Sequence, residues 1–163
     1  MLEPPILDRI RHIFLHPRPH VSISQASSLL GWSRVEMTNA IAAGEIELMT
    51  TALGKWVWRE ELMAKAVELW PREVIEEALG ADADAVLPHA VRLALLRARI
   101  PRYQLAMLEY FAEQHRTTVS DVLTRELEGV ASDHAEELAA VVPGFGAALA
   151  WPNAENADLS MLI

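Results

Sequence analysis

The chain has 163 residues, 52% of them apolar, which is enough for one ordinary domain or two very small ones. The absence of cysteine excludes disulfides and thiolate metal sites, and the formal net charge of −9 at pH 7 disfavours nonspecific binding to nucleic acid. No apolar run is long enough to span a membrane, and the first residues lack a signal-peptide layout, so we expect a soluble cytoplasmic protein.

The negative charge is concentrated in two segments. Residues 71–88 hold one basic and five acidic residues, and residues 131–163 hold no basic and five acidic ones. Residues 1–70 hold seven basic and eight acidic residues, and residues 89–130 hold six and five. Only the two nearly neutral segments are therefore expected to meet phosphate groups.

Short helices and one hairpin are predicted for the first half of the chain. Apolar residues spaced near 3.6 predict a helix at 6–14, which Pro17 ends. Ser22 or Ser24 is a good N-cap for the second helix, and Ser33 caps the third. The later helices are predicted at 24–30, 34–43, 60–69 and 72–79, and β-like runs at 46–50 and 55–58. Small and acidic residues at 80–84 favour a linker, which we place at 80–90.

Motifs within residues 21–69 indicate a helix-turn-helix followed by a wing. The helix SQASSLLG runs into the turn GWSR, and the second helix ends at GEI before the strand KWVW. This stretch resembles the winged helix-turn-helix of the MerR and excisionase families. The resemblance implies that the second helix enters the major groove of double-stranded DNA. The residues implied to face DNA are Ser33, Arg34, Met37, Thr38 and Asn39, with Lys55 at the wing tip.

The same module has a second interpretation. Arg34 is offset by Glu36, so the second helix neutralises little phosphate charge and its binding to DNA is expected to be weak. A helix-turn-helix of this kind also suits a protein partner or a neighbouring domain. We expect Ala26 to be buried against the second helix, and Trp56 and Trp58, on one strand face, to lie in the core.

Residues 95–127 predict one strand followed by two helices. In a strand, Leu96, Ala98 and Ile100 share one face, and the intervening residues share the other. The apolar helix stripes are Leu105, Leu108, Phe111 and Ala112, then Val122, Leu123, Leu127 and Val130. Together these faces make a core that is too thin for one chain, so we predict that two chains pair their strands antiparallel. A helix at 91–100 is the alternative, because Ala, Leu and Arg are good helix formers.

The RIP step at 99–101, the two helix stripes and the turn TTVSD at 117–121 resemble the ribbon-helix-helix family of Arc-like and CopG-like repressors. The resemblance implies a homodimer whose ribbon enters the major groove, where arginine binds guanine in bidentate fashion. It also implies that backbone N–H groups at the start of the second helix bind a phosphate. The same fold also serves for dimerisation alone. The residues implied are Leu95, Arg97 and Arg99 in the ribbon, and Thr118 and Val119 at the phosphate.

Motifs of enzymes and metal sites are missing from the sequence. It has no phosphate-binding glycine loop, nucleophile elbow or His-Glu-x-x-His pattern, so we expect neither catalysis nor a cofactor. His12, His16 and His20 are four residues apart, which on one helix would offer metal ligands. Pro17 and Pro19 interrupt that helix, and we expect these histidines to be solvated or to cap a helix.

We therefore predict a mainly α protein with one short intermolecular strand per chain. Its parts are a winged helix-turn-helix at 1–79, a linker at 80–90, a ribbon-helix-helix at 91–142 and an acidic, partly mobile tail at 143–163. The predicted function is sequence-specific DNA binding by a dimeric repressor of its own operon. The layout of a DNA-binding dimer with an apolar tail end, Leu159, Met161, Leu162 and Ile163, looks like that of an antitoxin and implies a protein partner at the tail. The alternative for the tail is a disordered, solubilising chain. The alternative is a non-enzymatic adaptor that uses both modules to dimerise and dock a partner.

Overall fold

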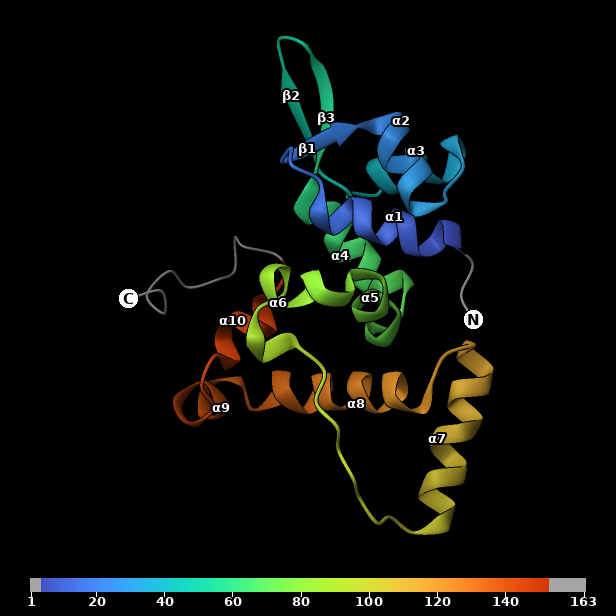
Figure 1. Cartoon of the computed structure of the whole chain (residues 1–163), viewed down its shortest axis with the longest axis vertical. Coiled ribbons are helices and arrows are strands. Elements are labelled where there is room, and N and C mark those ends of the chain that lie inside the picture. The colour runs from blue at the N-terminus through green and yellow to red at the C-terminus, as the bar shows by residue number, and fades with distance from the viewer. Residues whose placement is uncertain (1–3, 153–163) are drawn as a thin grey trace.

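The computed structural model describes residues 4–152 as a mainly helical chain with a small three-stranded antiparallel sheet (Figure 1). The helices are α1 Pro4–Leu15, α2 Ile23–Leu30, α3 Arg34–Ala42, α4 Arg59–Leu69, α5 Arg72–Leu79, α6 Ala83–Val86, α7 Arg102–His115, α8 Val119–Asp133, α9 Ala135–Val141 and α10 Phe145–Ala150. The strands are β1 His20–Ser22, β2 Leu48–Thr51 and β3 Gly54–Trp58. Single 3-10 turns cover Gly80–Asp82 and His89–Val91. The predicted helical class is confirmed.

Serine caps begin the two central helices. Ser22 Oγ accepts a hydrogen bond from the Gln25 N–H (3.1 Å) and starts α2, which ends at Gly31 in the left-handed conformation (φ +71°). Ser33 starts α3 with a capping box, in which its N–H donates to the Glu36 carboxylate at 2.6 Å. These local bonds explain why both helices were predictable from the sequence.

The sheet has the order β1–β3–β2, and β1 was not predicted. Val21 pairs with Val57, and Leu48 pairs with Val57 from the other side, so these three residues share the face toward the core. Trp56 and Trp58 therefore lie on the outer face, where Trp58 is 39% exposed. The expectation that both tryptophans belong to the core is wrong, because strand alternation gives the single inward position between them to Val57.

The N-terminal unit, as we call α1–α6 with the sheet, holds the main core. Helix α1 packs against α2, α4 and α5. Its Arg11 donates hydrogen bonds to the carbonyls of Ala78 (2.8 Å) and Leu79 (3.1 Å), which satisfies acceptors at the end of α5. Ala26 is fully buried, as predicted.

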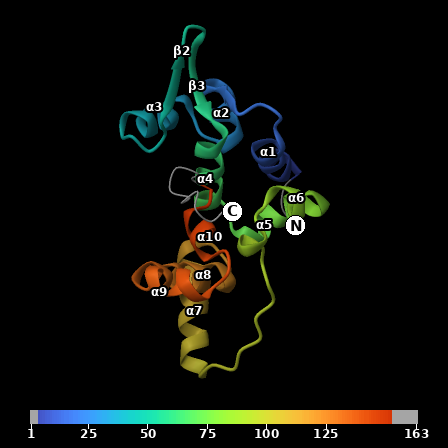
Figure 2. The same ribbon diagram turned by 90° about the vertical axis from the view of Figure 1, so that its left-hand side faces the viewer.

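The chain stays attached to this core beyond the point where we placed a linker. Ala83, Leu87 and Val91 are buried members of the N-terminal core, so residues 80–90 pack against it. The exposed connection comes later, at Leu93–Pro101, which we call the arm. Figures 1 and 2 show the arm running away from the helices before it enters α7.

The last described residues return to the N-terminal unit. Helix α10 packs against the 3-10 turn at His89–Val91, and Trp151 stacks on Phe14 of α1 with ring centroids 6.2 Å apart. The predicted mobile tail thus begins with a packed helix. Residues 153–163, and with them the predicted partner site at the tail end, lie outside the described residues.

Helices α7 and α8 pack against each other but bury little apolar surface in one chain. Only Ala112 and Val122 of the two predicted stripes are fully buried. Four members remain substantially exposed: Leu105, Phe111, Leu127 and Val130. Large apolar side chains left open on a helix pair indicate a missing packing partner.

No helix within residues 4–152 combines the length and the apolar character needed to cross a membrane.

Candidate nucleic-acid interface

Helix α3 presents four of its five predicted DNA-facing residues to solvent. Ser33, Arg34, Thr38 and Asn39 are exposed, although the Thr38 hydroxyl already donates to the Arg34 carbonyl at 2.8 Å. Met37 is the exception, since it is only 1% exposed. The prediction that Met37 faces DNA is wrong, because residues 37 and 40, three apart on one helical face, anchor α3 to the core.

The β2–β3 hairpin carries the predicted wing contact. Lys55 is exposed on β3, next to the turn at Gly54. The indole N–H of Trp56 donates to the Thr51 hydroxyl at 3.1 Å, and so ties the two strands together just behind the tip. Leu53 at the tip is 89% exposed. The hairpin therefore holds one cation at a braced and protruding position.

A groove of about 540 Å³ runs between α2 and α3. Its lining consists of Ile23, Ser24, Ser27, Arg34, Met37, Thr38 and Ile41. Arg34 is the only charged residue of this lining, and it takes part in none of the ion pairs formed by residues 4–152. The groove is thus lined by one cation that forms no ion pair within the described residues.

The electrostatics of α3 limit what it can do alone. Hydrogen bonds from the Ser33 backbone N–H and, secondarily, from its hydroxyl lower the pKa of Glu36, so this carboxylate stays charged at neutral pH. Arg34 and Glu36 therefore cancel. The weak charge of this helix, inferred from the sequence, holds in three dimensions, so α3 alone neutralises little phosphate charge.

The arm carries two exposed positive charges. Leu95 is 83% exposed, and Arg97 and Arg99 are also exposed. Neither arginine forms an ion pair with any described residue, and residues 93–108 contain no acidic residue. The alternative of a helix at 91–100 is wrong, since residues 93–100 form no regular structure in the single chain. A strand that pairs between two chains needs a second copy, and it stays a prediction.

The start of α8, where the sequence predicted a phosphate contact, lies next to an acidic side chain. Thr118 is the N-cap, and its hydroxyl oxygen accepts from the Asp121 N–H at 3.0 Å. The same hydroxyl lies 3.4 Å from a carboxylate oxygen of Glu73 on α5, while Val119 is half-buried. A carboxylate thus stands beside the predicted phosphate position and must move away before an anion binds there.

The two predicted DNA surfaces lie at opposite ends of the molecule. Figure 1 places α3 and the hairpin in its upper part, whereas the arm descends from the middle of the picture past α8 to the bottom. The structure therefore does not bring Arg34 and Lys55 together with the arm arginines. Glu73 and Glu76 of α5 were not identified from the sequence as residues that contact the second half of the chain. Their spacing of three, which places both acids on one face of a helix, was the available signal.

The histidines at the end of α1 form a small stacked pair. The rings of His12 and His16 lie 4.7 Å apart, and His12 contacts the Gln25 side chain at 3.1 Å. Burial and, secondarily, the neighbouring His16 lower the pKa of His12, so it is neutral near pH 7. Within residues 4–152, no three side chains of His, Asp or Glu gather closely enough to hold a metal ion.

Comparisons with protein-family models, with curated proteins and with solved structures find no match for this chain.

Proposed function

We propose that the chain is a dimeric, sequence-specific DNA-binding regulator that represses transcription. The observation that carries this proposal is the arm, an exposed and acid-free segment whose two arginines form no ion pair within residues 4–152, joined to helices with uncovered apolar faces. Paired with the arm of a second chain, it forms a two-stranded ribbon of the width that enters the major groove. The open faces of α7 and α8 then close the dimer core.

The N-terminal unit supports the same proposal as a second contact. Helix α3, capped by Ser33 and exposed on its outer side, suits a winged helix-turn-helix recognition helix, and Lys55 suits a backbone contact at the wing. Because α3 has a weak net charge, the N-terminal unit has a supporting role in this proposal. The arm arginines then provide most of the phosphate neutralisation.

A fluorescence-anisotropy titration tests this function against the DNA upstream of the gene, with scrambled DNA of equal length as control. Binding should prefer the upstream DNA and weaken by roughly a hundredfold between about 50 and about 200 mM salt, as expected for about four phosphate contacts. Equal or absent binding to both DNAs would reject the proposal.

One observation favours a second candidate, a protein-docking adaptor. Three DNA contacts were predicted: the arm, the start of α8 and helix α3 with its wing. An acid lies at two of them, Glu73 beside Thr118 at the start of α8 and Glu36 on α3. In this function the same dimer holds a protein in the groove between α2 and α3. It predicts no sequence-dependent DNA binding, so the titration above separates the two candidates.

A further inference from the structure

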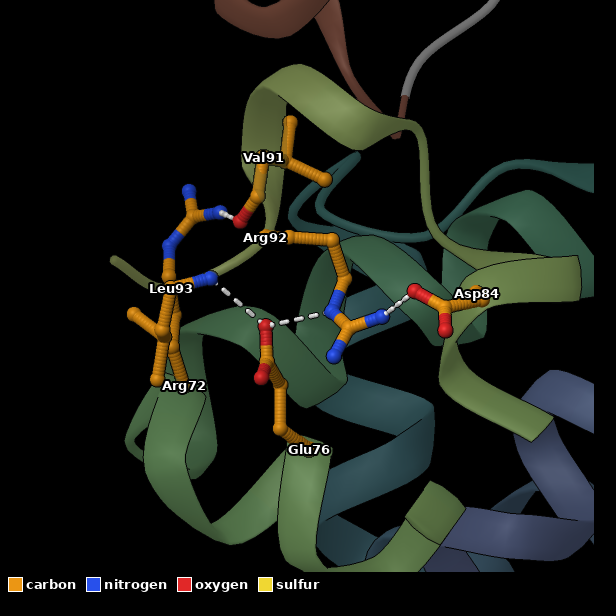
Figure 3. Close-up of polar contacts among 6 residues, drawn as sticks. All are labelled: Arg72, Glu76, Asp84, Val91, Arg92 and Leu93. Carbon is orange, nitrogen blue, oxygen red and sulfur yellow. Dashed lines mark hydrogen bonds and ion pairs between the residues drawn. The ribbon is translucent and has the colours of Figure 1, made fainter. Parts of the chain in front are cut away.

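One carboxylate oxygen on α5 fixes the point where the arm begins. Glu76 Oε1 accepts a hydrogen bond from Arg92 Nε at 3.0 Å and another from the Leu93 backbone N–H at 2.7 Å (Figure 3). The other end of the Arg92 guanidinium pairs with Asp84. The residue before the arm and the first residue of the arm are therefore both tied to α5.

Arg72, one turn earlier on α5, reaches three separate parts of the second half of the chain. Its Nη1 donates to the Val91 carbonyl at 3.5 Å, and its Nη2 lies 3.5 Å from a carboxylate oxygen of Glu128 on α8. Its guanidinium also lies over the Trp151 ring at 5.7 Å from the centroid. A single side chain thus contacts Val91 just before the arm, helix α8, and the segment after α10.

The Arg92–Glu76 pair is better sheltered than an ordinary surface ion pair, whereas Glu128 and Asp84, the partners of Arg72 and of the far end of Arg92, are 56% and 88% exposed. The side chains of Arg72, Glu76 and Arg92 are 21%, 18% and 26% exposed, and Ile75 and Val91 are buried beside them. Partial burial reduces screening by salt and lowers the entropy lost on pairing, because the neighbouring side chains already restrict the geometry. The contacts are therefore suited to holding a fixed arrangement.

The arm itself is held only at its ends. Side chains of residues 94–101 form no hydrogen bond or ion pair within the described part of the chain, and all are exposed. Nine extended residues span about 30 Å, so a small rotation at Leu93 moves the far end considerably. The direction of the arm depends on how firmly its root is fixed.

We propose that Arg72 and Glu76 of α5 form a clamp that fixes the N-terminal unit relative to the arm and the C-terminal helices. This inference rests on the proposed function, and it adds how the DNA site is selected. In a dimer joined through its arms, two clamped N-terminal units stand at one separation and orientation. The clamp then determines the spacing between the outer DNA half-sites that the two copies of α3 accept.

The first experiment measures, without DNA, the distribution of distances between the N-terminal unit and α7. Because the chain lacks cysteine, Ser28→Cys on α2 and Gln114→Cys on α7 create the only two labelling sites, both at exposed positions. Single-molecule energy transfer is recorded on doubly labelled chains diluted into excess unlabelled protein. We expect one narrow distribution for the parent chain and a broad one after Arg72→Gln with Glu76→Gln.

The matched control is Arg125→Gln with Glu77→Gln. It also removes one positive and one negative charge, but Arg125 pairs only within α8, and Glu77 is exposed and outside the described ion pairs. The energy-transfer distribution of this control should stay narrow. A clamp variant as narrow as the control, or a parent chain as broad as the clamp variant, overturns the proposal. If circular dichroism shows that the double variant has unfolded, Glu76→Gln is compared with Glu77→Gln instead.

The second experiment measures half-site selection. Lengthening the operator spacer by about five base pairs rotates one half-site by about half a turn. The parent chain should then bind roughly tenfold more weakly, and the clamp variant should lose this preference. An unchanged preference overturns the spacing role. If the parent chain binds no specific DNA, the proposed function and the spacing role both fail, while the energy-transfer result still decides whether the clamp exists.

Discussion

Trp151 stacks on Phe14, with ring centroids 6.2 Å apart, and so joins the segment after the last described helix to the first helix of the fold. The contact spans most of the chain, and Arg72 covers the tryptophan from α5. The second half of the protein is therefore part of the structure that stabilises the first, although its helices α7 and α8 bury little by themselves.

Trp151→Ala should lower the free energy of unfolding by about 2 kcal/mol, which is less than the roughly 3–5 kcal/mol of a fully buried aromatic because Trp151 is half-buried. Urea denaturation followed by circular dichroism measures it. Leu149→Ala, an exposed position on α10, is the control and should change the midpoint little. Equal effects of both variants would contradict the docking contact.

Arg97→Ala with Arg99→Ala should abolish specific DNA binding, by about a hundredfold or more, while the chain stays folded and dimeric. The reason is that both side chains are exposed, and in the proposed function they contact DNA and lie outside the dimer core. Arg18→Ala with Arg125→Ala removes two positive charges elsewhere and should cost far less. Specific binding that survives the arm variant would show that the arm does not read DNA.

Ile100→Asp should prevent dimer formation, because it places a charge in the core that the two chains of the proposed dimer share. Leu95→Asp adds the same charge on the opposite face of the predicted strand and should leave the dimer intact. Sedimentation equilibrium distinguishes the two. A dimeric Ile100→Asp chain would mean that the strand face, or the ribbon itself, has been assigned incorrectly.

Met37→Ala should destabilise the N-terminal unit by about 2–4 kcal/mol, because it empties a fully buried position. Asn39→Ala, two residues later and exposed, should change stability by less than about 0.5 kcal/mol and should weaken DNA binding instead. Thermal unfolding and anisotropy together test this division. A neutral Met37→Ala would place α3 differently on the core.

Glu36→Gln should destabilise the chain at neutral pH and matter less in acid. Hydrogen bonds from Ser33 lower the pKa of the folded Glu36 below its ordinary value of 4.5. The stability they contribute is therefore present above that ordinary value and is lost as the pH falls through the lowered one. The difference in urea midpoint between parent and variant should be largest at pH 7 and should shrink as the pH is lowered below 4.5. Glu77→Gln serves as a control without a capping bond, and a pH-independent difference would contradict the capping role.

Local signals in the sequence were sufficient for most helices. The caps at Ser22 and Ser33, Pro101 before α7 and Thr118 before α8 act within three or four residues of themselves, so their effect does not depend on the rest of the fold. The exposed arginines of the arm were also predictable, because charged residues in an alternating segment have few buried alternatives.

Contacts between distant parts of the chain were decided only by the tertiary structure. The strand β1 needs β3 as its partner, and Met37 is buried because α3 meets the core along that face. In the sequence, Glu73 and Glu76 were only two of the acidic residues counted in segment 71–88, yet packing brings them to Thr118, Arg92 and Leu93. The sequence thus determined most of the helices, since capping and periodicity are local, whereas only packing determined the strand β1, which side chains are buried and which charges meet.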